Sequence, residues 1–302
     1  MVVDFKQLIS DIVIDTNDKM HKQCKFCGKL LDLKDYRALY ENNYIENIAT
    51  AYSRCNCEET DKIWKRYDEL IEKEKLRDFN LKQIDKLFQN NNLGKRQLNS
   101  TFQNYKINNK NKKAYENAKN YADKLINGET NKGLFITGTY GVGKTYLASC
   151  IANEVIKNKN TVVFGTLIQL LDYIKDTYKD SDISDKEYLN LYSSVDLLII
   201  DDLGKEKPTE WVLEKLFLIV NNRYNNYLPI VITTNYNRNQ LRERLCINKN
   251  YSMVDSIISR LYEMCGGIEI KDDDHRMSKI PNFGKNDRNT EITKTENKFN
   301  KI

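Results

Sequence analysis

One segment of the sequence has the residue types and the spacing of a phosphate-binding loop. Its eight positions are Gly138, Thr139, Tyr140, Gly141, Val142, Gly143, Lys144 and Thr145. It follows the apolar run 134–136 and precedes the helical pattern 146–156, which is the strand, loop and helix context that this motif requires. Such a loop points backbone N–H groups at a phosphate, while Lys144 reaches the β- and γ-oxygens and the Thr145 hydroxyl ligates Mg²⁺. A chance glycine-rich turn would not satisfy all of these positions, so the sequence predicts a nucleoside triphosphate site.

A second candidate segment is an apolar strand that ends in two carboxylates. Asp201 and Asp202 follow the run 195–200, and Asp201 lies 57 residues beyond Lys144. In phosphate-loop enzymes the first acid holds the Mg²⁺ shell, and the next can orient and deprotonate the attacking water. Two acids capping a strand end would look the same in isolation. The upstream loop is what favours the Mg²⁺ interpretation.

Two later polar residues are weaker candidates for the same chemistry. Asn235 ends the apolar strand 229–234, where a neutral amide could hydrogen-bond both the γ-phosphate and the lytic water. Arg260 lies on the mostly apolar helical segment 255–262. An arginine there is explained either by a surface ion pair or by an arginine finger offered to the γ-phosphate of a neighbouring subunit.

Four cysteines near the N-terminus have the spacing of a metal site. Cys24 and Cys27 form a C-x2-C pair, and Cys55 and Cys57 form a C-x-C pair after a gap of 27 residues. Four thiolates can close a tetrahedral Zn²⁺ site and leave no open position for catalysis, so we expect a structural zinc. The alternatives are unligated cytosolic thiols, or His21 in place of one cysteine. Core packing explains the cysteines in or beside apolar helical runs: Cys150, Cys246 and Cys265.

The bulk composition is that of a chain with room for one ordinary domain and a smaller one. It has 302 residues, of which 40% are apolar, and 48 basic against 43 acidic residues give a net charge of +5. This charge permits contact with nucleic acid but does not by itself indicate it. No run approaches the roughly eighteen apolar residues of a membrane span, and the N-terminus lacks a signal-peptide pattern, so we expect a cytoplasmic protein.

The elements that must position these residues divide the chain into four parts. We expect a zinc-binding N-terminal domain over 1–57, a helical linker over 58–97, an α/β domain over 98–280 and a disordered polar tail over 281–302. Apolar spacing predicts one long amphipathic helix over 58–89, and packing on its own domain is favoured over partner binding. Five short apolar runs predict a parallel sheet: 134–137, 161–164, 197–200, 230–233 and 268–270.

Together these segments resemble the AAA+ ATPases, specifically the bacterial helicase loaders of the DnaC/DnaI type and the related transposition ATPase IstB. The resemblance covers roughly residues 98–280 and is carried by five motifs: Gly138–Thr145, Asp201-Asp202, Thr233–Asn235, Ser259–Leu261 and Asp274–Arg276. It implies an AAA+ phosphate-loop core with a five-stranded parallel sheet. It also implies that Asn235 is sensor one, Arg260 the trans-acting finger and Arg276 sensor two.

The same resemblance implies an ATP-dependent helicase loader with ATP, Mg²⁺ and Zn²⁺ as cofactors. Its expected partners are a DnaB-type hexameric replicative helicase held by the N-terminal domain, single-stranded DNA, and further copies of itself when ATP and helicase are bound. Asp202 stands where most AAA+ members have glutamate, and its shorter reach predicts slow, switch-like hydrolysis.

Two alternative functions stay open at the level of sequence. An IstB-like transposition helper ATPase would use the same core, and the cysteine quartet weighs against it. A phosphate-loop small-molecule kinase would work without DNA, and Asn235 and the late arginines weigh against it.

A basic and aromatic cluster precedes the phosphate loop and could contact nucleic acid. Its members are Tyr105, Lys106, Lys110, Lys112, Lys113 and Tyr115. Lysines beside aromatic rings can hold phosphates and stack bases, although a solvated helix start explains the same pattern and is favoured. Binding of single-stranded DNA is therefore an expectation that rests on the family resemblance.

Overall fold

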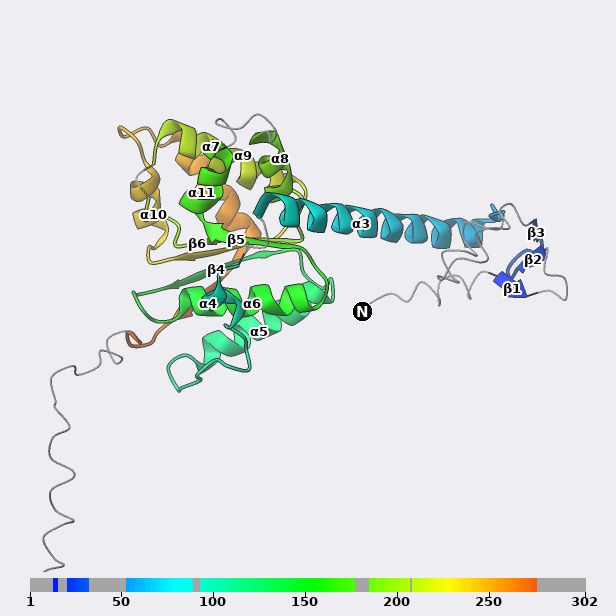
Figure 1. Cartoon of the computed structure of the whole chain (residues 1–302), viewed down its shortest axis with the longest axis horizontal. Helices are drawn as coiled ribbons and strands as arrows, with labels where there is room; N and C mark the ends of the chain where they lie inside the picture. Colours follow the sequence, from blue (N-terminus) through cyan, green and yellow to red (C-terminus); the bar gives the residue numbers. More distant parts are fainter. Residues whose placement is uncertain are drawn as a thin grey trace, which may run out of the picture.

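The computed structural model describes residues 13–15, 21–32, 53–88, 93–176, 185–206 and 208–275. Figure 1 shows an α/β body built on one sheet, from which the long helix α3 (Glu58–Phe88) extends to a small N-terminal sheet. The predicted polar tail and Arg276 lie outside the described residues. The domain boundaries drawn from the sequence stay predictions.

The body is organised around a five-stranded parallel sheet, as predicted, and its strands lie in the order β5-β6-β7-β4-β8. Its strands are β4 (Gly133–Gly138), β5 (Val162–Thr166), β6 (Leu197–Asp201), β7 (Ile230–Thr234) and β8 (Cys265–Ile270). The largest difference from the predicted runs is the start of β8. There Gly266 and Gly267 pair with β4 through their backbones, which an apolar pattern cannot indicate.

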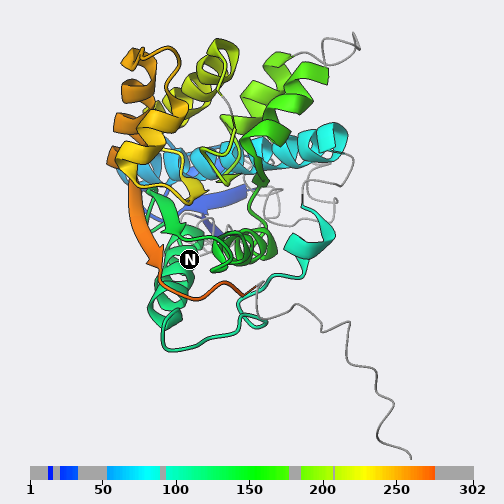
Figure 2. The ribbon, with the colours of Figure 1, turned by 90° about the vertical axis from the view of Figure 1, so that its left-hand side faces the viewer.

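Helices cover both faces of this sheet, which is why its central strands read as unbroken apolar runs. Successive residues point to opposite faces, so Leu197 and Ile199 of β6 join one core while Leu198 and Ile200 join the other. The first core is closed by α5 (Lys112–Ile126) and α6 (Lys144–Lys157). The second is closed by α7 (Leu167–Asp176), α8 (Asp185–Tyr192), α9 (Glu210–Asn225), α10 (Arg238–Leu245) and α11 (Ser252–Met264). Figures 1 and 2 show the two layers on either side of the strands.

The segment before α5 packs on the first of these layers. It contains the short helix α4 (Lys95–Leu98), which lies against α6. The Asn153 side-chain amide of α6 donates to the carbonyl oxygens of Gln97 at 2.7 Å and Ser100 at 2.8 Å. Phe102 is buried beside Tyr115 of α5, with ring centroids 5.6 Å apart. These contacts fix the segment 97–102 against α5 and α6.

Helix α3 is 31 residues long, or about 46 Å, and is anchored at its two ends. At the C-terminal end the Asn80 amide donates to the carbonyl of Ser194 at 3.1 Å and accepts from its hydroxyl at 3.0 Å, while Ile84 and Leu87 enter the second core. At the N-terminal end Trp64 and Tyr67 are buried. The predicted amphipathic helix is confirmed over residues 58–88, and both ends pack on the chain itself.

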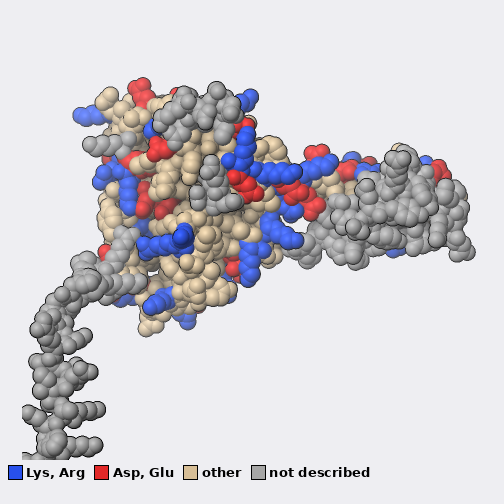
Figure 3. Space-filling view, viewed as in Figure 1, with Lys and Arg blue, Asp and Glu red and all other residues tan. Residues whose placement is uncertain are grey.

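The middle of α3 is exposed between these anchors. Leu76 and Phe79 are 48% and 57% exposed. Figure 3 shows lysine, arginine, aspartate and glutamate side chains intermingled along the helix. Its stability in this stretch therefore depends on helix propensity and on pairs such as Arg77 with Glu74, whose charged atoms lie 3.6 Å apart at i,i+3 spacing.

The N-terminal sheet is antiparallel and consists of β1 (Val13–Asp15), β2 (His21–Cys24) and β3 (Leu30–Asp32). The turn between β2 and β3 carries Cys27 and Gly28, and Gly28 takes the left-handed conformation, with φ of 70°. The chain returns to this sheet at Ser53, whose N–H donates to the carbonyl of Asp32 at 2.8 Å. Within the described ranges, every helix is too short or too polar to cross a membrane.

Candidate active site and metal centre

The phosphate loop connects β4 to α6, as the sequence predicts, and three of its glycines have positive φ. Gly141 shows why a side chain is excluded. Its φ is 75°, and a Cβ atom there would lie 1.7 Å from Oδ1 of Asp274. The N–H of His275 also donates to the Gly141 carbonyl at 3.2 Å. The loop is therefore curled between the start of α6 and the segment that follows β8.

The loop's lysine and threonine face the carboxyl edge of the sheet. Lys144 is 6% exposed, and its Nζ donates to the carbonyl oxygens of Gly138 at 3.0 Å and Thr139 at 2.6 Å. The Thr145 hydroxyl lies 2.9 and 3.0 Å from the two carboxylate oxygens of Asp201. The sequence-predicted Mg²⁺ ligands Thr145 and Asp201 are thus brought together from residues 56 positions apart.

Asp201 ends β6 and is almost fully buried, with 6% of its surface exposed. Its Oδ1 also accepts a hydrogen bond from the Thr233 hydroxyl of β7. Burial raises the pKa of Asp201, and the charge of Asp202 adds to the rise, while the hydrogen bonds from Thr233 and Thr145 oppose it. A divalent cation would relieve this cost, because it would stabilise the ionised carboxylate that burial disfavours.

Asp202 leaves the strand in the left-handed conformation, with φ of 59°. Its N–H donates to the Thr233 hydroxyl at 2.8 Å, and one carboxylate oxygen lies 2.5 Å from Nζ of Lys205. The second predicted acid is therefore at the site but already ion-paired. The sequence reading overlooked Lys205, although a cation three residues after an acid in a turn at the carboxyl edge of a sheet is a detectable signal.

Asn235 follows β7 and has the clearest unused hydrogen-bonding capacity at the site. Both polar atoms of its amide are buried, and neither has a hydrogen-bond partner among the described residues. A buried amide without partners costs free energy, so its position is explained by a ligand that supplies an acceptor and a donor. This is what the sequence predicts for a group that contacts a γ-phosphate and a water.

These residues line one cavity of about 590 Å³. The volume is within the range of small-molecule and cofactor sites. Aromatic and polar side chains from the segment before α5 form part of its wall. The lining residues are Arg96, Gln97, Ser100, Asn104, Tyr105, Lys106, Tyr140, Gly141, Gly143, Lys144, Thr145, Tyr146, Ser149, Asp201, Asp202, Lys205, Asn235 and His275. The donor set fits a nucleoside triphosphate with Mg²⁺: the loop and Lys144 for phosphates, Thr145 and Asp201 for the metal.

The basic and aromatic cluster predicted before the loop is divided by the fold. Tyr105 and Lys106 line the cavity, whereas Lys110 pairs with Asp273 at 2.6 Å. Lys112 begins α5 and Lys113 is exposed, as a solvated helix start requires. Burial raises the pKa of Tyr105 to about 12. Tyr105 is thus a neutral wall of the cavity at ordinary pH.

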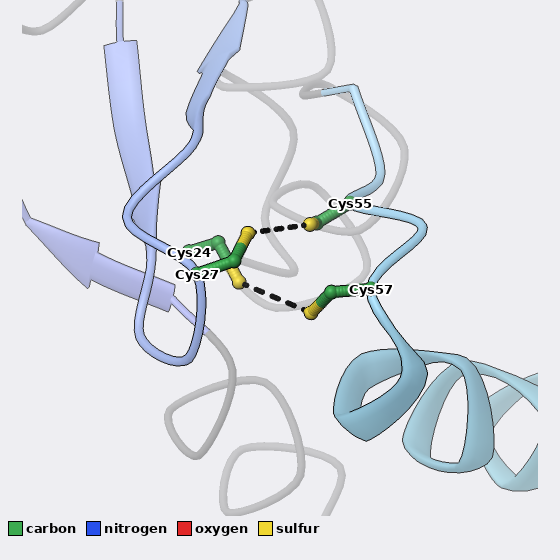
Figure 4. Close-up of side chains that lie close together, drawn as sticks. All are labelled: Cys24, Cys27, Cys55 and Cys57. Atoms are coloured by element: carbon green, nitrogen blue, oxygen red, sulfur yellow. Dashed lines mark hydrogen bonds between the residues drawn. The ribbon is translucent and has the colours of Figure 1, made fainter.

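The four predicted zinc ligands converge at the junction of the N-terminal sheet and α3 (Figure 4). All four sulfur atoms lie within 4.8 Å of one another, with Cys27 and Cys55 3.1 Å apart and Cys24 and Cys57 3.9 Å apart. Tetrahedral sulfur ligands at about 2.3 Å from zinc lie about 3.8 Å apart, so the group fits a Zn²⁺ ion. Burial raises the pKa of the Cys55 thiol, but hydrogen bonds from Cys27 and Cys57 outweigh it and lower the value to about 7.

The surroundings hold these thiols in place. The Thr60 hydroxyl lies 3.3 Å from Sγ of Cys57 and donates to the Cys55 carbonyl at 2.9 Å. Arg54 packs over the Trp64 ring at 4.4 Å and forms a two-bond ion pair with Asp68 of α3. The metal cluster and the first turns of α3 are therefore one packed unit.

The family model for IstB-like ATP binding proteins matches residues 40–281, which is well over half of the 302-residue chain. The chain belongs to this family. The predicted resemblance is thereby confirmed, and ATP binding is a property of the family as described.

Two curated relatives of this IstB-like protein carry the name of replicative helicase loader. It is 32% identical to DnaC of Escherichia coli K12 over 151 residues, 49% of this chain and 60% of DnaC. It is 26% identical to DnaI of Bacillus subtilis over 133 residues, 44% of this chain and 42% of DnaI. The chain thus spans about half the length of the curated relatives it matches.

Solved structures agree with this likeness. The crystal structure of the DnaC helicase loader superposes with a TM-score of 0.51 at 28% identity, covering 59% of this chain and all of that one. The DnaI crystal structure gives 0.50 at 25% identity, covering 60% of this chain and 93% of that one. The AAA+ fold predicted from the motifs is therefore confirmed for the IstB-like core.

Arg260 of this IstB-like protein lies away from the cavity of its own chain. It is on α11, where Nε donates to the Asn221 side chain at 3.1 Å and Nη1 donates to the Ser256 carbonyl at 3.0 Å. Its guanidinium also packs over Phe217 at 5.3 Å. Any contact with a γ-phosphate would have to be in another subunit. Arg276 is not among the described residues, but the adjacent His275 lines the cavity.

The remaining cysteines differ from one another. Cys150 is fully buried in α6, and burial raises its pKa to about 12, as core packing requires. Cys265 packs against the second core, and burial raises its pKa as well. Cys246 instead follows the last residue of α10 and is only partly buried, so the expectation of core packing is wrong there.

Proposed function

We propose that this chain is an ATP-dependent loader of a DnaB-type replicative helicase. One observation carries the ATPase half of the proposal: the amide of Asn235, buried and unpaired among the described residues, shares a cavity with Lys144 and the Thr145 and Asp201 pair. That arrangement supplies the contacts that a triphosphate, its metal and a water would need. The loader half rests on the names of the relatives that match the same core.

The proposed reaction uses five residues of the chain. Lys144 holds the β- and γ-phosphate oxygens, Thr145 and Asp201 hold the Mg²⁺ shell, and Asn235 orients the water. Asp202 accepts the proton that the water loses as its oxygen bonds to the γ-phosphorus. The bond from that phosphorus to the bridging oxygen breaks, and its electron pair stays on ADP.

A second chain would complete the site. In the proposed assembly Arg260 of one copy reaches the γ-phosphate held by its neighbour, and Arg276 contacts the nucleotide from within the same chain. Arg260 is suited to this because it is outside its own cavity and is held by Asn221 rather than by a carboxylate among the described residues. Moving the Arg260 guanidinium breaks two hydrogen bonds made by a charged group, to Asn221 and to the Ser256 carbonyl, at a cost of about 1.5–3 kcal/mol each that the γ-phosphate contact would have to offset. ATP would then favour an oligomer on single-stranded DNA.

The metal cluster and the N-terminal sheet form the proposed helicase-binding end. A pull-down with a DnaB-type helicase tests this directly, with and without ATP. We expect Cys24→Ser to lose helicase binding and keep ATP binding, and Lys144→Ala to do the reverse. Cys246→Ser is the control for a cysteine-to-serine change as such, because Cys246 lies outside the cluster, although it is less buried than Cys24. Helicase binding that survives complete metal removal would refute the assignment of this end.

A transposition helper is the second candidate, favoured by the description of the matching family itself. It would use the same ATP site on duplex DNA and engage a transposase in place of a helicase. Family membership gives no support to a small-molecule kinase. Binding of the chain to a transposase, with no binding to any DnaB-type helicase, would select this second function.

A further inference from the structure

The turn after β6 holds a lysine against the proposed proton acceptor. Nζ of Lys205 lies 2.5 Å from Oδ2 of Asp202, and both residues line the nucleotide cavity. The Asp202 side chain is only 23% exposed. This ion pair is therefore inside the site, and the Lys205 ammonium occupies the carboxylate oxygen that a water bound beside Asp202 would otherwise contact.

Hydrogen bonds and packing hold the backbone of this turn on several sides, so the Cα atom of Lys205 has a fixed position. The Thr234 hydroxyl donates to the Leu203 carbonyl at 2.7 Å. The N–H of Gly204 donates to the Glu206 carboxylate at 2.9 Å, and Glu206 is itself 9% exposed. A Cβ on Gly204 would lie 2.8 Å from Leu241 of α10, which shows how closely the turn is packed. Only the flexible stem of Lys205 is left to move its ammonium.

The same cavity holds the groups that would surround a γ-phosphate. Asn235 and Lys144 line it together with Lys205. A γ-phosphate carries more negative charge than one carboxylate and offers three oxygens, so it competes effectively for the Lys205 ammonium. ADP has no γ-phosphate and leaves the pair with Asp202 as it is.

We propose that Lys205 is a positioning residue whose ammonium leaves its ion pair with Asp202 and binds the γ-phosphate when ATP binds. This exchange rests on the ATPase activity proposed above. It adds a means by which a residue of the same chain regulates that activity. Without a γ-phosphate, the Lys205 ammonium stays in its ion pair with the Asp202 carboxylate. With one, Lys205 contacts the phosphate and Asp202 becomes available to the water. The Asp202 carboxylate is therefore free to contact the water only when ATP, the nucleotide that can be hydrolysed, is bound.

The test compares the affinities of the zinc-loaded full chain for a non-hydrolysable ATP analogue and for ADP, each with Mg²⁺, by titration calorimetry. Lys205→Ala is expected to weaken analogue binding about tenfold, the worth of one hydrogen bond to a charged group, and to change ADP binding less than about twofold. Asp202→Asn removes the competing carboxylate, so it is expected to tighten analogue binding. The double variant is expected to lose that gain, because the two residues act as a pair.

Lys119→Ala is the matched control, since Lys119 is an exposed lysine of α5 outside the cavity. An unchanged ratio of analogue to ADP affinity in Lys205→Ala overturns the exchange. If that variant does not fold, analogue binding by Asp202→Asn decides: tighter binding supports the exchange and unchanged binding overturns it. Failure of the proposed function looks different, because wild type would then bind neither nucleotide, or Lys144→Ala would bind both as wild type does.

Discussion

Replacing Thr233 with valine isolates the hydrogen bonds that hold the acid pair. The side chain is fully buried; it donates to Asp201 and accepts from the N–H of Asp202 at 2.8 Å. Valine keeps the shape and the strand preference but makes neither bond. A lost hydrogen bond to a charged group costs about 1.5–3 kcal/mol, and an orphaned buried N–H about 1–3 kcal/mol. We expect the free energy of unfolding to fall by about 3–5 kcal/mol, a large part of the 5–15 kcal/mol typical of proteins.

The loss of unfolding free energy in Thr233→Val should depend on pH. Burial raises the pKa of Asp201 above its ordinary value of 3.8, so the stability this carboxyl contributes is present below that value and is lost as pH rises through the folded pKa. Thr233→Val removes a hydrogen bond that opposes the rise, so the folded pKa moves higher. The destabilisation by Thr233→Val is therefore expected to be larger at about pH 7.5 than at about pH 4.5. Urea denaturation followed by circular dichroism measures it.

The neighbouring residue provides a control of the same type. Thr234 is also buried, and its hydroxyl makes two neutral hydrogen bonds, to the Leu203 carbonyl and from the Tyr236 N–H, without touching Asp201. Thr234→Val should destabilise by about 1–3 kcal/mol with no added dependence on pH in this range. Equal losses for the two valine variants at both pH values would show that Thr233 has no special effect on Asp201.

Three further perturbations test other parts of the molecule. Chelating the metal or making Cys24→Ser should increase amide exchange over 21–32 and the first turns of α3, while exchange in the five-stranded sheet stays as it was. Gly141→Ala should weaken ATP binding at least tenfold, and adding Asp274→Ala should recover part of the loss, because the steric clash goes and the strain at φ of 75° remains. Asn80→Ala should lower stability by about 1–3 kcal/mol in urea, and failure to do so would mean that its bonds to Ser194 do not anchor α3.

Local motifs predicted the parts of the site that contiguous residues form. The phosphate loop and the cysteine pairs have fixed short spacings, and unbroken apolar runs place Asp201 and Asn235 at the carboxyl ends of neighbouring strands. The sequence also predicted the five strands, because strands buried on both faces are apolar throughout.

The rest of the site depends on packing between distant segments. Tyr105 and His275 reach the cavity only because the chain before α5 and the chain after β8 both lie against the phosphate loop. Lys205 becomes significant only when the left-handed Asp202 turns its carboxylate back toward it. Local sequence periodicity does not predict these long-range contacts, because they follow from how the helices and strands pack on one another.

The unbroken helix α3 also connects the metal cluster rigidly to the body, so a small rotation at one end becomes a larger displacement at the other. Its C-terminal end is fixed to the body at Asn80, Ile84 and Leu87, and its other end is one unit with the metal cluster. The part of the helix beyond Asn80 is about 33 Å long, so a tilt of only about 10° at the body would carry the metal cluster through about 6 Å. Small rearrangements around α8, against which the helix is seated, would thus become large displacements of whatever the far end holds.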